Sequence, residues 1–70
     1  MRYEPKRVKA WMLEVEISQA EMAREMGVSP SMVSSFIAAK SVSMRLFQYF
    51  LERGCPPRLL AGRPEARRAA

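Results

Sequence analysis

An all-α fold is predicted for this chain of 70 residues by two features of the sequence. No stretch alternates apolar and polar residues in the way of a half-buried strand, and β-branched residues are few. Apolar residues instead recur at helical spacing, with serine, proline and glycine at the points where helices would begin and end. We therefore expect one small domain of five helices, which hides only about 60% of its extended-chain surface and is modestly stable.

The first helix is expected from Pro5 to Glu14 or Val15, because proline suits a first helical turn. One face is apolar at positions i, i+3, i+4 and i+7, which predicts a buried stripe. The stripe consists of Val8, Trp11, Met12 and Val15. The opposite face carries Lys6, Arg7 and Lys9. These basic side chains either contact phosphates or face solvent. Trp11 is interpreted as a core residue and not as a platform on which a base would stack.

A second helix is expected directly after Ser18. The Ser18 hydroxyl can accept a backbone N–H, and Glu21 can reach back to the Ser18 amide, which is the pattern of a capping box. Gly27 ends this helix, since glycine most easily takes the left-handed conformation found after helices. The apolar face consists of Met22, Ala23 and Met26.

A third helix is expected from Pro30 to Ala38. Proline at the first helical position loses no useful N–H, and it favours the extended conformation that Ser29 needs as an N-terminal cap. The inner face is apolar, made by Val33, Phe36 and Ile37. The outer face is small and largely polar, made by Ser31, Ser34, Ser35 and Ala38. With Val28 pointing into the core, the second and third helices are interpreted as a helix-turn-helix.

Two further helices are expected in the C-terminal third. Ser43 caps the fourth, with Val42 as an apolar staple, and Gly54 ends it. Pro56 and Pro57 begin a short fifth helix. The apolar residues of this region are Leu46, Phe47, Tyr49, Phe50, Leu51, Leu59 and Leu60. Residues 63–70 show no apolar periodicity, so the domain is expected to span residues 1–62 and to be followed by a basic flexible tail.

The charge balance favours a polyanionic partner. Twelve Lys and Arg residues against seven Asp and Glu give a net charge of +5, which suits nucleic acid or an anionic membrane surface. No apolar stretch approaches the length of a membrane span, and no signal-peptide core follows the basic N-terminus. We therefore expect a cytoplasmic protein without a membrane partner.

The residue types that catalysis and metal binding need are largely absent. Histidine and aspartate do not occur, and Cys55 is the single cysteine. This excludes an internal disulfide and a cysteine-based metal cluster, and it removes the usual general base and nucleophilic triads. We expect no enzyme, no cofactor and no metal. Cys55 is either a reactive thiol or a filler of the loop or core.

The segment ISQAEMAREMGVSPSMVSSFI, residues 17–37, resembles the phage-repressor and Cro-like helix-turn-helix proteins, the XRE family. The resemblance rests on Gln19 opening the first motif helix, Ala23 at the helix crossing and Gly27 in the turn, with Val33 and Phe36 on the buried side of the second helix. It implies a compact lambda-repressor-like domain of five helices. Family members commonly have a glycine or similar loop residue before the capping box, where this chain has residues 14–17, EVEI.

The resemblance implies that the second motif helix enters the major groove of double-stranded DNA and that the protein regulates transcription, as a repressor. The implied base-facing residues are Ser29, Pro30, Ser31, Ser34 and Ser35, with Met32 offering apolar contact. The implied backbone contacts are Gln19, the amides of Ser31 and Met32, and Lys40. No Arg, Gln or Asn stands among the base-facing residues, so specificity is expected to depend on DNA shape, water or the arm of residues 1–4.

Two questions stay open at this stage. The serine-rich helix also suits close packing against protein, so the alternative function is a module that binds a regulator or toxin without DNA. The apolar residues of the C-terminal third outnumber what one face can bury, which predicts a homodimer with Tyr49 and Leu59 in the interface. The same residues could instead close the core of a monomer.

Overall fold

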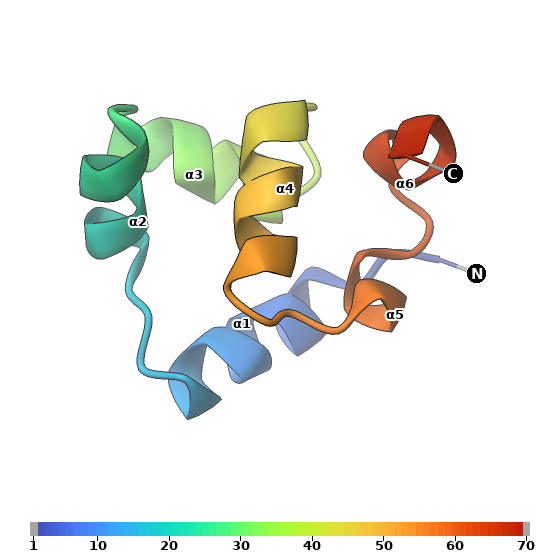
Figure 1. Ribbon diagram of the computed structural model, residues 1–70, viewed down its shortest axis with the longest axis horizontal. Helices are drawn as coiled ribbons and strands as arrows, with labels where there is room; N and C mark the ends of the chain where they lie inside the picture. Colours follow the sequence, from blue (N-terminus) through green and yellow to red (C-terminus); the bar gives the residue numbers. More distant parts are fainter. Residues whose placement is uncertain (1, 70) are drawn as a thin grey trace.

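The computed structural model of this protein describes residues 2–69 and contains six helices in that range. They are α1 (Pro5–Glu14), α2 (Gln19–Met26), α3 (Pro30–Ile37), α4 (Met44–Glu52), α5 (Pro57–Leu60) and α6 (Pro64–Ala69). In Figure 1, α4 stands at the centre, with α2 and α3 on one side and α5 and α6 on the other, while α1 crosses below. The described residues contain no strand, so the all-helical prediction is confirmed, with one helix more than expected.

Three serines begin helices as the sequence predicts. The hydroxyls of Ser18, Ser29 and Ser43 accept the backbone N–H three residues on, at 3.1, 3.2 and 3.3 Å. Each bond satisfies one of the N–H groups that a helix start leaves without a partner. At the other end of α2, Gly27 has φ 69°, the left-handed conformation expected of it. The helix-turn-helix is therefore delimited by local signals.

The core is centred on Phe50 of α4. Its ring stacks on Phe36 of α3, with centroids 5.6 Å apart, and meets Trp11 of α1 at 5.9 Å. The predicted core is confirmed for Val8, Trp11, Met12, Ala23, Val33, Phe36, Leu46, Phe47 and Phe50, which are buried, and Met26 is half-buried against them. These aromatic contacts thus join α1, α3 and α4.

Two predicted core positions are exposed. Val15 is 42% exposed because α1 ends at Glu14, so the residue no longer continues the helical stripe. Val42 is 53% exposed and does not act as a staple. The start of α4 is held instead by Glu65, whose carboxylate accepts the Ser43 N–H at 2.9 Å.

The prediction that residues 63–70 form a flexible tail is wrong for the part that the structure describes. Residues 64–69 form α6, Arg63 is 2% exposed and Glu65 is fully buried. The two side chains form an ion pair, with Nε of Arg63 3.1 Å from Oε1 of Glu65. This segment joins the domain through buried charge, which a search for apolar periodicity cannot detect. Residue 70 lies outside the described residues.

The apolar residues of the C-terminal third, whose number predicted a homodimer, are mostly used within the folded chain. Leu46, Phe47, Tyr49, Phe50 and Leu60 are buried within one chain, and Leu51 and Leu59 are half-buried against the same core. These residues close the core of the monomer. No helix within residues 2–69 combines the length and the apolar character needed to cross a membrane.

Cys55 lies in the loop between α4 and α5 and is buried. Burial raises the pKa of its thiol to about 11, which leaves the thiol protonated and poorly nucleophilic near neutral pH. Its Sγ lies 3.7 Å from the carbonyl oxygen of Pro56. Of the two interpretations of this cysteine, the structure supports the core filler.

Glu16 has φ 57°, which is the left-handed region, and it lies within residues 14–17, the segment where the resemblance implies a glycine or similar loop residue. Left-handed backbone costs a residue with a Cβ about 1–2 kcal/mol, and glycine avoids this cost. We expect Glu16→Gly to raise the free energy of unfolding by about 0.5–1 kcal/mol. Urea titration measures the change. Ala10→Gly, at an exposed position inside α1, should lower stability by a similar amount. Equal losses in both variants would contradict the strain at Glu16.

A second prediction concerns alkaline pH. Because the folded thiol of Cys55 ionises near pH 11 and an unfolded one near 9, the folded state holds the proton over that interval and stability falls as the pH rises through it. Between pH 7 and pH 10 this contributes a loss of about 1.4 kcal/mol. Unfolding of the parent and of Cys55→Ala at both pH values, under reducing conditions, isolates the effect. Identical pH dependence in the two proteins would rule it out.

Candidate nucleic-acid interface

The turn between α2 and α3 fixes how the two helices meet. Gly27 turns the chain, and the N–H of Val28 then donates to the carbonyl of Ala23 at 3.0 Å. Ala23 is buried, as expected of a residue at a close helix crossing, and Val28 is half-buried against the core. α3 is thereby held against α2 by its inner face, and its outer face is left accessible.

The outer face of α3 carries small uncharged side chains. Ser31, Ser34, Ser35 and Ala38 stand at i, i+3, i+4 and i+7, opposite the buried residues of the same helix. Ser31 and Ser34 are exposed, and Ser35 is half-buried. Met32 flanks this stripe and is 45% exposed. The face can offer hydroxyl and apolar contacts to a partner, with little steric hindrance.

The first turn of α3 includes three of the predicted site residues. Ser29 is the cap, Pro30 is exposed at the first helical position, and the N–H of Met32 is already bonded to the hydroxyl and carbonyl of Ser29. Of the two amides expected to meet phosphate, Met32 is thus occupied within the turn. The Ser31 N–H belongs to the first helical turn, whose N–H groups have no intrahelical acceptor and point outward along the axis.

Gln19 opens α2 and is half-buried at an open groove. The groove is lined by Lys9, Met12, Leu13, Ile17, Ser18 and Gln19. Lys9 comes from α1, so the structure brings one of the three basic residues of that helix beside the start of α2. The amide side chain and the ammonium group can both donate to an anion there. The sequence indicated Lys9 only as one of three basic residues on a face of the first helix. It gave no reason to choose Lys9 over Lys6 or Arg7 as a site residue.

Lys40 lies beyond the other end of α3 and is exposed. Its N–H donates to the carbonyl of Ser35 at 2.9 Å, and the preceding Ala39 has φ 64°. Since an eight-residue helix is about 12 Å long, Lys40 and the Ser29 cap mark the two ends of the serine face. The predicted backbone contacts come from three separate segments: the start of α2 with Gln19, the first turn of α3, and the residues after α3 with Lys40.

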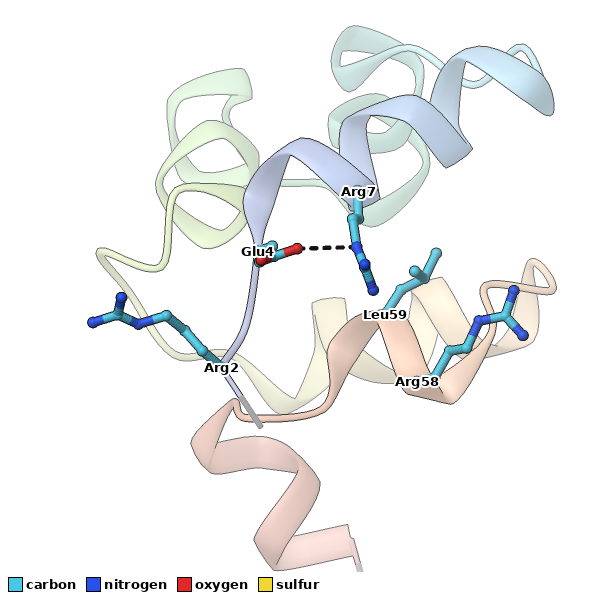
Figure 2. Close-up of a pocket in the computed structure, with 5 residues that line it drawn as sticks. All are labelled: Arg2, Glu4, Arg7, Arg58 and Leu59. Atoms are coloured by element: carbon cyan, nitrogen blue, oxygen red, sulfur yellow. Dashed lines mark ion pairs between the residues drawn. The ribbon is translucent and has the colours of Figure 1, made fainter.

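A second groove, between α1 and α5, carries two further basic residues of the N-terminal region, Arg2 and Arg7. It is lined by Arg2, Glu4, Arg7, Arg58 and Leu59 (Figure 2). Arg7 pairs with Glu4 at 2.9 Å, while Figure 2 shows Arg2 and Arg58 directed away from that pair. Both partners of the pair are more than half exposed, so it adds little to stability. None of the predicted site residues lines this groove.

The N-terminal arm is packed on the domain. The hydroxyl of Tyr3 donates to the carbonyl of Ile37 at 2.9 Å, at the end of α3. The guanidinium of Arg63 lies over the Tyr3 ring, 4.5 Å from its centroid. Burial raises the pKa of Tyr3, although Arg63 opposes this. Tyr3 is therefore held at α3, and among residues 2–4 of the arm Arg2 and Glu4 are the exposed ones.

Sequence reasoning missed several contacts that position the motif. Arg45 of α4 donates to the carbonyl of Met26 at the end of α2, at 3.1 Å. Tyr49 of α4 donates to the carboxylate of Glu25 on α2. Burial, followed by this bond, raises the pKa of Tyr49 to about 12. The partners in these two contacts are separated by 19 and by 24 positions in the sequence. No local motif predicts contacts over such separations.

Comparison with known proteins agrees with this geometry. A family model described as helix-turn-helix matches residues 8–48, from α1 to the first half of α4. Searches of curated proteins and of solved structures found no significant match. The matched span contains the complete motif and parts of α1 and α4, and it covers more than half of the chain. The protein therefore belongs to the XRE family of helix-turn-helix proteins, a family of DNA-binding regulators.

Proposed function

We propose that this protein binds double-stranded DNA in the cytoplasm and regulates transcription, with α3 in the major groove. The observation that carries the proposal is the outer face of α3: a small, uncharged surface opposite a fully buried face, with a cationic side chain just beyond its end. A helix with this surface can approach base edges closely. The net charge of +5 supplies the general attraction to DNA.

In this proposal, phosphate contacts position the protein and α3 reads the bases. Gln19, the Ser31 amide and Lys40 contact the DNA backbone, and Lys9 joins Gln19 on the same strand. Ser29, Ser31, Ser34 and Ser35 offer hydroxyls to base edges. Pro30 and Met32 offer apolar contact to thymine methyl groups. Because hydroxyls do not select one base pair firmly, much of the discrimination comes from DNA shape and bridging water.

We further propose that the regulation is repression. A domain seated in the major groove of a promoter occupies base pairs and backbone that RNA polymerase must contact. Occupancy alone is then sufficient to lower transcription, and no additional contact with polymerase is required. A promoter-reporter assay with the selected binding site placed inside or upstream of the promoter tests this part of the proposal.

Duplex binding is expected to weaken steeply as salt rises, because Lys and Arg side chains displace condensed counterions. Six phosphate contacts give a slope of log K against log salt of roughly −5. Lys40→Ala should flatten the slope by about 1 for each bound copy and weaken all duplexes equally. Fluorescence anisotropy at several salt concentrations measures both values.

Arg67→Ala is the matched control, since it removes the same charge from an exposed position on α6, outside both the serine face and the groove between α1 and α5. It should leave the slope closer to that of the parent than Lys40→Ala does. Equal changes in the two variants would remove Lys40 from the interface. A parent protein that binds no duplex at low salt, yet co-purifies with a protein partner after nuclease treatment, would favour the alternative protein-binding module.

We propose that two copies act on one site. A single α3 without a bidentate base reader discriminates weakly, and two such helices about 34 Å apart on a two-fold axis double the contacts. Tyr49 is buried and bonded to Glu25, so it is not available for the interface predicted from the sequence. Leu59 is half-buried at the groove between α1 and α5 and remains available.

Selection from random duplexes is therefore expected to enrich two-fold symmetric sites, and sedimentation of the complex should give two proteins per duplex. Leu59→Ser should weaken binding to the full site while binding to a half-site is unchanged. A one-to-one complex on an unsymmetrical selected site would exclude the dimer and leave the DNA-binding proposal intact.

A further inference from the structure

Three side chains from the two ends of the chain converge on the C-terminal end of α3. They are Tyr3 of the arm, and Arg63 and Glu65 at the start of α6, and together we call them the buried clamp. Arg63 is 2% exposed and Glu65 is fully buried. The guanidinium lies between two rings, 3.8 Å from the centroid of Phe36 and 4.5 Å from that of Tyr3. The clamp is therefore part of the domain interior.

The hydrogen bonds of the clamp hold the segment that links α3 to α4. Nη1 of Arg63 donates to the carbonyl of Phe36 at 2.7 Å, and Nη2 donates to the carbonyl of Ser41 at 3.1 Å. Glu65 accepts the N–H of Ser43 at 2.9 Å. One ion pair thus fixes the end of α3, the middle of the connection and the cap of α4.

The remaining donors complete the arrangement. Nε of Arg63 donates to Glu65 at 3.1 Å, and the hydroxyl of Tyr3 donates to the carbonyl of Ile37 at 2.9 Å. The last carbonyls of a helix lack intrahelical partners and carry partial negative charge. The clamp supplies donors to two of them, and Arg63 also supplies a positive charge at that end. The planar guanidinium presents its donors in a rigid fork, so these bonds share one orientation of the Arg63 side chain.

We propose that the buried clamp is a positioning device for DNA binding. It sets the direction of α3 against α4 and places Lys40, which lies between the clamped carbonyls of Phe36 and Ser41, at the phosphate backbone. This inference rests on the function proposed above. A buried ion pair pays a large desolvation cost that well-packed apolar residues avoid, so its stabilising value alone does not explain its presence. Hydrogen bonds from the Arg63 side chain and from the Ser43 amide outweigh the effect of burial and lower the pKa of Glu65, so the pair is ionised at neutral pH.

The test uses a double variant that leaves the net charge unchanged, Arg63→Gln with Glu65→Gln. If the clamp only contributed charge or stability, the folded double variant would bind DNA like the parent. As a positioning device, its loss should weaken duplex binding roughly tenfold at a temperature where the variant is folded. The salt slope should also flatten by about 1, because Lys40 no longer reaches its phosphate.

Lys40→Ala in the double-variant background provides the readout that a purely structural role would not change. The two effects should be strongly non-additive, with Lys40→Ala costing little once the clamp is lost. Arg67→Gln with Glu14→Gln is the matched control: it also leaves the net charge unchanged, but both side chains are exposed. This control should bind and respond to Lys40→Ala as the parent does. Full additivity in the clamp variant would overturn the proposal.

Two further measurements keep the inference testable if the double variant folds poorly or if DNA is not the partner. Tyr3→Phe removes a single hydroxyl and is expected to weaken duplex binding roughly threefold. Amide hydrogen exchange at Lys40 and Ser43, measured without DNA, should accelerate in the clamp variants while exchange in α2 is unchanged. A parent that binds no DNA would defeat the proposed function alone. Unchanged exchange and unchanged binding in Tyr3→Phe and in Arg63→Lys would defeat the clamp.

Discussion

The stack of Phe36 on Phe50 is the contact on which the rest of the domain depends. α3 has eight residues, which is too short to be stable as an isolated helix, so its position is fixed by what its inner face touches. Phe36 joins α3 to α4, Phe50 passes the contact on to Trp11 of α1, and the guanidinium of Arg63 covers the Phe36 ring. Every group proposed to meet DNA from α3 is therefore placed by a contact on the opposite side of the same helix.

This arrangement separates two tasks along one short helix. The inner face uses its volume for packing, and the outer face keeps small side chains that interfere little with a close partner. Charge is placed outside the helix, with Lys40 after its end and Lys9 beside the start of α2. In an interface built this way, affinity comes mainly from the backbone phosphates, and sequence preference comes from fit and DNA deformability. The absence of Arg, Gln and Asn from the serine face is then consistent with binding but sets a limit on discrimination.

The parts of the fold that could be predicted are those whose partners lie a few residues apart. Ser18, Ser29 and Ser43 each bond an amide three positions on, so their sequence context contains the whole interaction. Arg63 and Phe36 are 27 positions apart, and Tyr3 and Ile37 are 34 apart, so no local pattern indicates either contact. The same reason explains why residues 63–69 resembled a solvated tail. For the candidate site, the motif predicts α3 and Lys40, and these assignments stay predictions. The position of Lys9 beside Gln19 at one groove depends on the folded chain, because the two residues lie on different helices.

The clamp also changes how the net charge should be interpreted. A count of +5 treats every arginine alike, but Arg63 is buried against Glu65, and Arg7 and Arg53 lie within ion-pair distance of Glu4 and Glu25. The pairs leave the net charge unchanged, but they show that the count does not say which cations are free to meet an anion, so the position of each one matters. Lys40 follows a residue with left-handed backbone and precedes a carbonyl held by Arg63, which leaves its Cα little freedom. In the proposed complex, which has no strong base reader, such control of one lysine would link the buried ion pair to the affinity for DNA.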